Sequence, residues 1–157
     1  PRHPRPAPPP PPPPHRRPAD GELSCGPHAP VSGQVRWVAV ESTETSCDHS
    51  FVNREEAEVV AELVTELGHE CVVLSPYAAQ CRHLLSKKMG VQVHTVDSFQ
   101  GREHDAVILS VVRTGDDGMG FWEDPRRVVV ALTRARTTLI LVHSPKITGL
   151  VRSIMPA

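Results

Sequence analysis

The chain has 157 residues, with 17 Lys and Arg against 18 Asp and Glu, and a formal net charge of −1. This length suits one domain of ordinary size and excludes a two-domain motor. The charge excludes nucleic-acid binding through a strongly basic surface alone. No apolar run approaches the roughly 18 residues that span a bilayer. The N-terminus has Arg and Pro but lacks the apolar region of a signal peptide. We therefore expect an intracellular protein, nuclear or cytoplasmic, without membrane contact.

The N-terminal segment is defined by proline. Of the 17 prolines, 13 lie within residues 1–30, and seven of these form the run Pro8–Pro14. Because proline fixes φ and removes a backbone donor, residues 1–30 are predicted to be a disordered tail or linker and residues 31–157 a folded domain. The run suits either a stiff spacer or a ligand for an SH3- or WW-type groove. Since the first residue is Pro, not Met, we expect a fragment or a processed chain.

Strands and helices alternate in the first part of the folded domain. A short apolar strand is predicted at 35–40. Asn53 is an N-cap residue and Glu56 stands in the capping-box position, so a helix is expected from there to Gly68. The acidic residues of this helix are interpreted as its solvated face, not as a carboxylate site. A buried strand at 71–74 and a helix at 77–88 follow.

Three strands and two helices are predicted for the rest of the chain, with strands at 91–96, 106–112 and 139–142, and helices at 125–134 and 147–155. Asp124 caps the first of these helices, and Pro125 occupies a position where its missing N–H is harmless. Apolar strands that alternate with helices indicate an α/β fold with a mostly parallel sheet of about five strands and helices on both faces.

Scattered cysteines and histidines raise the question of a metal site. No C-x-x-C pair joins the four cysteines, which are Cys25, Cys47, Cys71 and Cys81. Without a secretory signal, they are expected to be reduced thiols. Cys25 and His28 have a spacing seen in zinc sites, but the second pair, Cys47 and His49, is separated by one residue only. We reject the zinc site in favour of solvent-facing loops and predict no metal site.

The segments that follow the strands are the candidate binding site, because ligands of parallel sheets meet the loops beyond the carboxyl ends of the strands. Hydroxyl, amide and charged side chains gather at 75–80 and 95–105. The backbone around Gly101 can approach a phosphate closely, since no Cβ intervenes.

Arginines bracket the helix predicted at 125–134. Arg126 and Arg127 precede Arg134 by about two helical turns, so all three can share a face. Guanidinium groups read phosphate oxygens through bidentate hydrogen bonds. The alternative is a surface salt-bridge network with neighbouring acids such as Asp124.

Three segments resemble, in order and spacing, motifs IV, V and VI of superfamily 1 helicases: Ser-Pro-Tyr-Ala-Ala-Gln (75–80), Thr-Val-Asp-Ser-Phe-Gln-Gly-Arg-Glu (95–103) and Arg-Arg-Val-Val-Val-Ala-Leu-Thr-Arg-Ala (126–135). The pattern is similar to the branch that includes the nonsense-mediated-decay helicase and senataxin. Further matches are the S-x-x-N-x-x-E-A helix start at 50–57 and the residues at 108–113 and 120–121. Departures are Val128 and Val129, where relatives often have Leu and Asn, and His143, where they often have Gly.

The resemblance implies a RecA-like, P-loop-NTPase-type three-layer fold and the C-terminal half of an ATP-dependent DNA or RNA helicase. It implies that Arg134 is the arginine finger on the γ-phosphate of ATP. Gly101 and Glu103 would then face the nucleotide, while Arg126 and Arg127 would support the interdomain cleft. It also implies contacts to a nucleic-acid backbone, from Ser75, Tyr77, Gln80, Thr95 and Ser98. Tyr77 has an alternative role as a packing residue at a helix start.

A Walker A loop and an acidic Mg²⁺-binding segment are missing from the chain. ATP and Mg²⁺ are therefore expected to bind only together with an N-terminal helicase domain, and single-stranded DNA or RNA is the expected further partner. The chain alone is predicted to be inactive in ATP hydrolysis. The alternative function is a catalytically inactive RecA-like module that binds nucleic acid or protein, with the polyproline run as a docking arm.

Overall fold

The computed structural model describes residues 33–154. The polyproline run, and with it the predicted SH3- or WW-type contact, lies outside these residues, as do Cys25 and His28. Five parallel strands form the main sheet in the order β1-β7-β6-β4-β5. Their bounds are β1 (Gln34–Ala39), β4 (Val72–Ser75), β5 (Gln92–Thr95), β6 (His104–Ser110) and β7 (Ala135–His143). The predicted α/β fold with about five parallel strands is confirmed.

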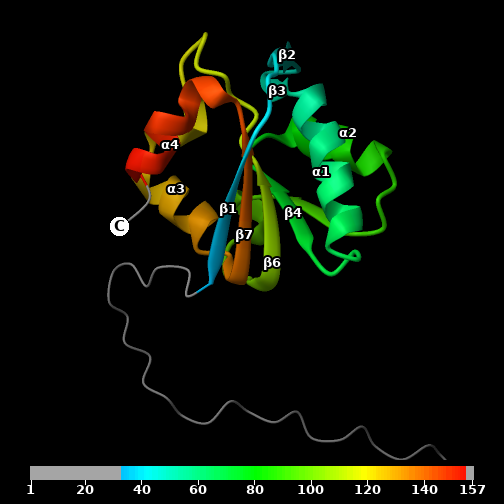
Figure 1. Cartoon of the computed structure of the whole chain (residues 1–157). Coiled ribbons are helices and arrows are strands. Elements are labelled where there is room, and N and C mark those ends of the chain that lie inside the picture. Colours follow the sequence, from blue (N-terminus) through cyan, green and yellow to red (C-terminus); the bar gives the residue numbers. More distant parts are fainter. Residues whose placement is uncertain (1–32, 155–157) are drawn as a thin grey trace, which may run out of the picture.

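Helices cover both faces of this sheet (Figure 1). Helices α1 (Arg54–Glu66) and α2 (Ala78–Ser86) pack on one face, and α3 (Pro125–Leu132) and α4 (Thr148–Ile154) lie on the other. In β6, Ile108 packs toward α1, while Val107 and Leu109 pack toward α3. Because both faces of each central strand are buried, the strands are continuous apolar runs and not alternating patterns.

A hairpin of β2 (Thr45–Cys47) and β3 (Ser50–Val52) stands at the carboxyl edge of the sheet (Figure 1). No strand was expected in this segment. Its turn is formed by Asp48 and His49, with φ of 49° and 60°. Aspartate is common at the first of these positions, but the second usually holds glycine and here holds His49, so the sequence lacks the familiar hairpin signal.

The start of α1 confirms one prediction and corrects another. The Asn53 side chain accepts a hydrogen bond from Glu56 N at 3.0 Å, as expected of an N-cap residue. Glu56 does not complete the capping box, because Gln80 Oε1 accepts the Asn53 N–H at 2.9 Å. The Glu56 carboxylate turns instead to β6 and the residues that follow it.

The end of α3 lies two residues before the predicted end. The helix stops at Leu132, where the Thr133 hydroxyl bonds back to Val129 O at 2.8 Å. Strand β7 then begins at Ala135, four residues earlier than predicted, since its polar first residues pair with β6. Arg134 therefore lies between the helix and the strand. The prediction that it shares a helix face with Arg126 and Arg127 is wrong.

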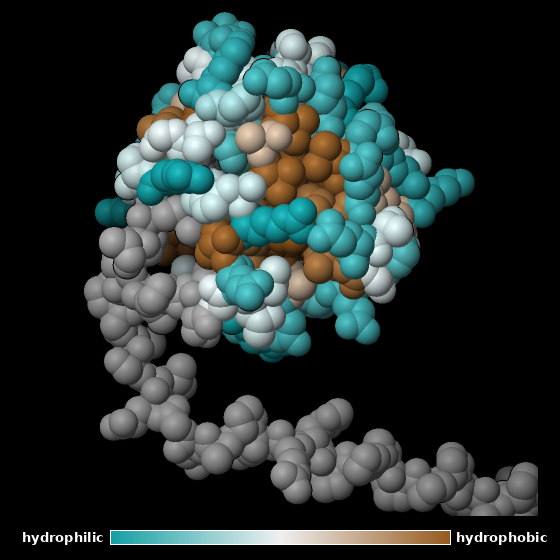
Figure 2. All heavy atoms as spheres, viewed as in Figure 1, coloured by the Kyte–Doolittle hydropathy of each residue, from teal (hydrophilic) through white to brown (hydrophobic). Residues whose placement is uncertain are grey.

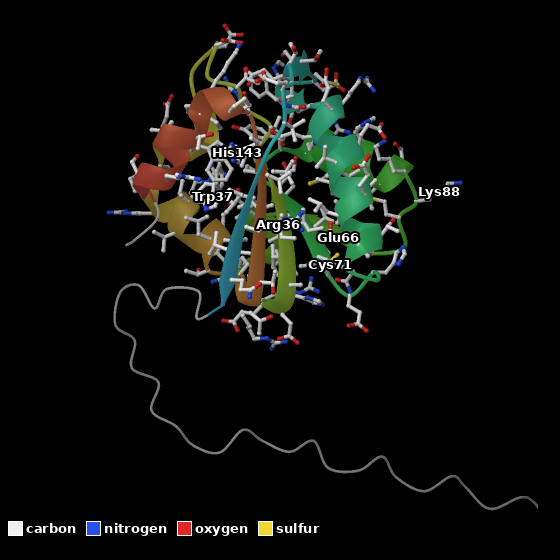
Figure 3. The ribbon with its side chains drawn as sticks, in the orientation of Figure 1. Arg36, Trp37, Glu66, Cys71, Lys88 and His143 are labelled. Atoms are coloured by element: carbon white, nitrogen blue, oxygen red, sulfur yellow. The ribbon has the colours of Figure 1, made fainter. Side chains whose placement is uncertain are left out.

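The surface between β1 and α1 is partly apolar. Partly buried Val38, Val40 and Val59 pack on the core there, and this face shows a hydrophobic area (Figure 2). Arg36 of β1 and Glu66 of α1 form an exposed ion pair across it (Figure 3). Within residues 33–154, no helix has the length and apolar character needed to cross a membrane.

Candidate functional site

The segments predicted from motifs V and VI meet at the amino ends of β6 and β7. The register pairs His104 with Ala135, so Glu103 and Arg134 each come directly before a paired residue. His104 N donates to Arg134 O at 3.0 Å, which joins the two segments. The carboxyl-end rule is wrong for this group, because residues 96–103 run from the carboxyl end of β5 to the amino end of β6.

Arg134 is half-buried and bound on all three guanidinium nitrogens by acceptors of the chain. Nε donates to Val130 O at 2.9 Å, Nη1 to Arg102 O at 3.1 Å and Nη2 to Thr133 Oγ1 at 3.2 Å. Val130 lies in the last turn of α3, where carbonyl groups lack helical partners and carry partial negative charge. The guanidinium therefore satisfies the helix end and is held beside the Gly101–Glu103 segment.

Gly101 gives this segment an open backbone. Its φ is +80°, in the region that favours glycine, and a Cβ placed there would meet no atom within 4 Å. The neighbouring Arg102 guanidinium stacks 4.7 Å from the Phe99 ring centroid and donates to Gln92 Oε1 at 3.1 Å. Glu103 is exposed. The arrangement offers accessible peptide groups and cationic side chains, which suit an anionic ligand.

Arg126 and Arg127 lie at the opposite end of α3, about 8–9 Å along the helix axis from its last residue, Leu132. The Arg127 side chain forms an ion pair with Asp97 of the short helix η1 (Asp97–Phe99). Its guanidinium also stacks 4.6 Å from the centroid of Phe121, in η2 (Gly120–Glu123). Arg127 thus ties the motif V segment to the motif VI helix, whereas the Arg126 side chain is exposed.

Thr95 and Ser98 lie at the carboxyl end of β5, where that strand turns into η1. Ser98 is exposed and Thr95 is half-buried. Ser98 N donates to Thr95 Oγ1 at 3.2 Å, and Ser98 Oγ donates to Thr95 O at 3.0 Å. These local hydrogen bonds fix the turn and leave the Ser98 side chain at the surface.

Ser75, Tyr77 and Gln80, the three residues expected from motif IV to contact nucleic acid, lie inside the domain. Ser75 and Gln80 are fully buried, and Tyr77 is 9 % exposed. Gln80 accepts from Asn53 N at 2.9 Å and donates to Asn53 O and Ser110 Oγ, each at 3.0 Å. Its amide is used within the domain, so a contact between Gln80 and nucleic acid would require these bonds to break.

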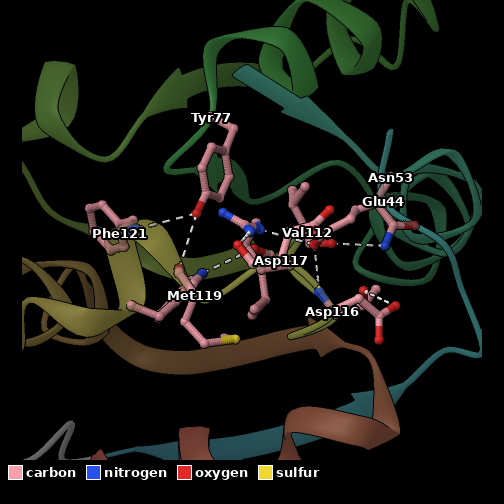
Figure 4. Close-up of polar contacts among 12 residues, drawn as sticks. Glu44, Asn53, Tyr77, Val112, Asp116, Asp117, Met119 and Phe121 are labelled. Atoms are coloured by element: carbon pink, nitrogen blue, oxygen red, sulfur yellow. Dashed lines mark hydrogen bonds and ion pairs between the residues drawn. The ribbon is translucent and has the colours of Figure 1, made fainter. Parts of the chain in front are cut away.

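Tyr77 takes the packing role that was its alternative. Its hydroxyl lies 3.4 Å from both Met119 O and Phe121 N, so it donates to the first and accepts from the second (Figure 4). The ring also packs edge-on against Phe51. Burial raises the pKa of this hydroxyl, and a hydrogen bond from Arg113 opposes that effect.

A buried ion pair beside Tyr77 was missed by the sequence reasoning. Arg113 Nε lies 3.0 Å from Glu44 Oε2, and their side chains are 3 % and 6 % exposed. Glu44 Oε2 also accepts from Thr114 N at 2.7 Å (Figure 4). The guanidinium lies 3.9 Å from the Phe51 ring centroid and donates to Asp117 O. Glu44 lies in a loop whose sequence has no periodicity, so no pattern marked it as buried. Arg113 was marked only as part of the segment 108–113 that matches the helicase family.

Glu56 is a second buried carboxyl at this edge. Its Oε2 accepts from Ser110 Oγ at 2.7 Å and from Val112 N at 2.9 Å, while Oε1 has no partner. Burial raises the pKa of this carboxyl to about 8, although its hydrogen bonds favour the charged form. Val112 has φ of +72°, a strained value for a β-branched residue, and it is held by Glu56 and by Asn53 Nδ2.

His143 is the departure at the end of β7. The side chain is 1 % exposed, and its ring meets Trp37 of β1 edge-on, with centroids 5.7 Å apart (Figure 3). Nδ1 lies 2.9 Å from Ser144 O. The imidazole therefore fills space between the sheet and the segment that follows it.

The residues at the amino ends of β6 and β7 fit the phosphate end of a nucleotide. Gly101 provides an unobstructed backbone, and Arg134 provides guanidinium N–H groups. A magnesium site does not fit the described part of the chain by itself, because residues 33–154 contain no group of three His, Cys, Asp or Glu side chains placed to hold a metal.

Comparisons with known proteins agree on one family. A family model described as an AAA domain matches residues 23–146. Regulator of nonsense transcripts 1 of Dictyostelium discoideum is 41 % identical over 66 % of this chain and 9 % of its own length. An uncharacterized ATP-dependent helicase of Methanocaldococcus jannaschii is 41 % identical over 69 % of this chain and 17 % of its own length.

Fold comparison gives a solved structure of similar architecture. The C-terminal domain of a possible DNA helicase from Lactobacillus plantarum aligns with a TM-score of 0.52 and 15 % identity, covering 78 % of this chain and 82 % of that one. At this identity the similarity concerns the fold alone. The chain spans less than a fifth of the length of each of the two curated relatives named above. The chain belongs to the AAA-domain family and is a superfamily 1 helicase C-terminal domain.

Proposed function

We propose that this domain completes the ATP site of a superfamily 1 helicase, with Arg134 as its arginine finger. ATP and Mg²⁺ would be held mainly by an N-terminal RecA-like domain that carries the phosphate-binding loop. Gly101 and Glu103 would face the nucleotide from this side of the cleft. A guanidinium in this role stabilises the charge that develops during phosphoryl transfer.

One observation carries the proposal: two segments about thirty residues apart in the chain join at one edge of the sheet. Arg134 Nη1 donates to Arg102 O at 3.1 Å, which places the guanidinium next to the open backbone of Gly101. An anion that meets this backbone lies within reach of the finger. Arg126 and Arg127 are assigned a supporting role at the far end of α3, since the Arg127 ion pair with Asp97 holds the two motifs together.

Nucleic acid is proposed to cross the carboxyl edge of the sheet. Thr95 and Ser98 are the candidates for contacts to its backbone, because both lie at the carboxyl end of β5 and Ser98 is exposed. Ser75, Tyr77 and Gln80 would act indirectly, by holding the loops around this edge. Hydroxyl groups that contact phosphate and sugar position a strand without reading its sequence, so these residues suit either DNA or RNA.

A chimera tests the proposed finger. The full 157-residue chain replaces the C-terminal domain of the Methanocaldococcus jannaschii helicase, and nucleic-acid-stimulated ATP hydrolysis is measured. Arg134→Ala should lower kcat by about three to five orders of magnitude, because that is the contribution of arginine fingers in NTPases. The KM for ATP should change little, since the finger acts mainly in the transition state.

The matched control is Arg136→Ala. Arg136 is two residues away, exposed and paired with Asp105 at 2.8 Å, so its loss removes the same charge without touching the finger. Its kcat should stay within about twofold of the unmodified chimera. A kcat unaffected by Arg134→Ala would contradict the proposal, and a chimera that binds nucleic acid without turnover would favour the inactive binding module. Turnover by the chain alone that depends on Arg134 would also contradict the split site.

A further inference from the structure

Thr133 lies between the end of α3 and the guanidinium of Arg134. Its Oγ1 is 2.8 Å from Val129 O and 3.3 Å from Val130 O, and it accepts from Arg134 Nη2 at 3.2 Å. A hydroxyl has one O–H donor, and here the helix carbonyls take it. The oxygen lone pairs are therefore turned toward the guanidinium.

The geometry points to Thr133 as the positioning residue of Arg134, an inference that rests on the proposed arginine finger. The hydroxyl is fixed by α3 and in turn fixes one edge of the guanidinium. Val130 O and Arg102 O hold the remaining sides. Arg134 is thereby oriented by the fold before any nucleotide is present.

The remaining donors are sufficient for phosphate recognition. A guanidinium carries five N–H groups, and the three hydrogen bonds of Arg134 use three of them. Two N–H groups remain, which is the number that a bidentate contact to phosphate requires. Because the long arginine side chain is already ordered, binding does not have to remove its rotamer freedom.

Rotation of the guanidinium gives a direct readout on the full chain. Rotation about the Arg134 Nε–Cζ bond exchanges Nη1 with Nη2, so it requires the bond to Thr133 to break. Nitrogen-15 NMR of the arginine side chains measures this rate, with the Arg134 signals assigned by their loss in Arg134→Lys. The rotation should be at least about tenfold slower for Arg134 than for exposed Arg126, as expected for hydrogen bonds of a charged group.

Substitutions at Thr133 separate positioning from packing. Thr133→Val keeps the branched shape but removes the hydroxyl, so the rotation should become about tenfold faster. Thr133→Ser keeps the hydroxyl and should restore slow rotation. Thr137→Val is the matched control, because the Thr137 hydroxyl donates to Asp105 O at 2.8 Å and has no bond to Arg134. Equal thermal unfolding of the variants establishes that the fold is retained.

Slow rotation that persists in Thr133→Val would overturn the inference, as would fast rotation in the unmodified chain. In the chimera, Thr133→Val should lower kcat about tenfold while the KM for ATP stays within about twofold, and Thr133→Ser should restore kcat. A parallel rise in KM, or no rescue by serine, would also overturn it. Failure of the finger itself is distinguishable, since Arg134→Ala would then leave turnover unchanged whatever the rotation rates show.

Discussion

Glu56 makes the stability of this domain dependent on pH in a direction that can be tested. The carboxyl is fully buried between α1 and the end of β6, with Oε2 bound to Ser110 and Val112 and Oε1 without a partner. The charged group that faces it is Glu44, whose negative charge further disfavours ionisation. Glu56→Gln is the informative change, because the amide oxygen can accept the same two hydrogen bonds without titrating.

The magnitude follows from the pKa of Glu56, which burial raises from 4.5 to about 8. The folded chain holds a proton that the unfolded chain releases above pH 4.5. This contribution to stability is therefore fully present below pH 4.5 and is lost as the pH rises through 8. The 3.5 pH units correspond to about 5 kcal/mol in total, of which about 2 kcal/mol is lost between pH 6 and pH 8.

Urea unfolding at pH 6, 7 and 8 measures this effect through the fluorescence of buried Trp122. The free energy of unfolding of the unmodified chain, minus that of Glu56→Gln, should fall by about 2 kcal/mol from pH 6 to pH 8. The subtraction removes the titration of His83 and His94. Burial lowers the pKa of both imidazoles, so their contribution to the free energy of unfolding rises with pH. A difference that is flat or rises with pH would refute the reasoning, because Glu56 would then be ionised in the folded chain.

Two further predictions use matched pairs of residues. Glu44→Ala should lower the free energy of unfolding by about 3–5 kcal/mol, because it leaves Arg113 buried without its partner. Glu66→Ala removes one member of an exposed ion pair and should cost less than about 1 kcal/mol. Equal costs in urea unfolding would contradict this prediction. Gly101→Ala and Gly68→Ala both add a Cβ at positive φ in open space, so each should cost about 1–2 kcal/mol of stability. In the chimera, only Gly101→Ala should raise the KM for ATP, and an unchanged KM would mean that no phosphate approaches this backbone.

Much of the layered fold could be predicted because its signals are local. The central strands are apolar on both faces, so they stand out as short runs, and Asn53 and Asp124 mark helix starts with side chains that do cap the helices. The hairpin could not be predicted, since Asp48 and His49 adopt positive φ without the usual glycine. The end of α3 was misplaced because no glycine follows Leu132 to mark where the helix stops.

The motifs of the sequence predicted which segments form the candidate site but not the places of these segments on the sheet. Order and spacing linked Gly101 and Arg134, and the structure brings their segments together. That they meet at the amino ends of the strands depends on the path of residues 96–103 across the sheet, which no local pattern encodes. The buried pair of Glu44 and Arg113 joins residues 69 positions apart, a separation that periodicity cannot bridge.

The energetics of Gln80 argue against a direct role for this residue in the proposed nucleic-acid contact. Its three hydrogen bonds, to Asn53 and Ser110, contribute about 1 kcal/mol each. Turning the amide toward a nucleic-acid strand would break them and leave the buried Asn53 N–H unpaired, at a further cost of about 1–3 kcal/mol. One new hydrogen bond to a phosphate does not offset that loss. Ser98 is already exposed and would give up only a local turn contact, so the proposal assigns the nucleic-acid contacts to the carboxyl end of β5.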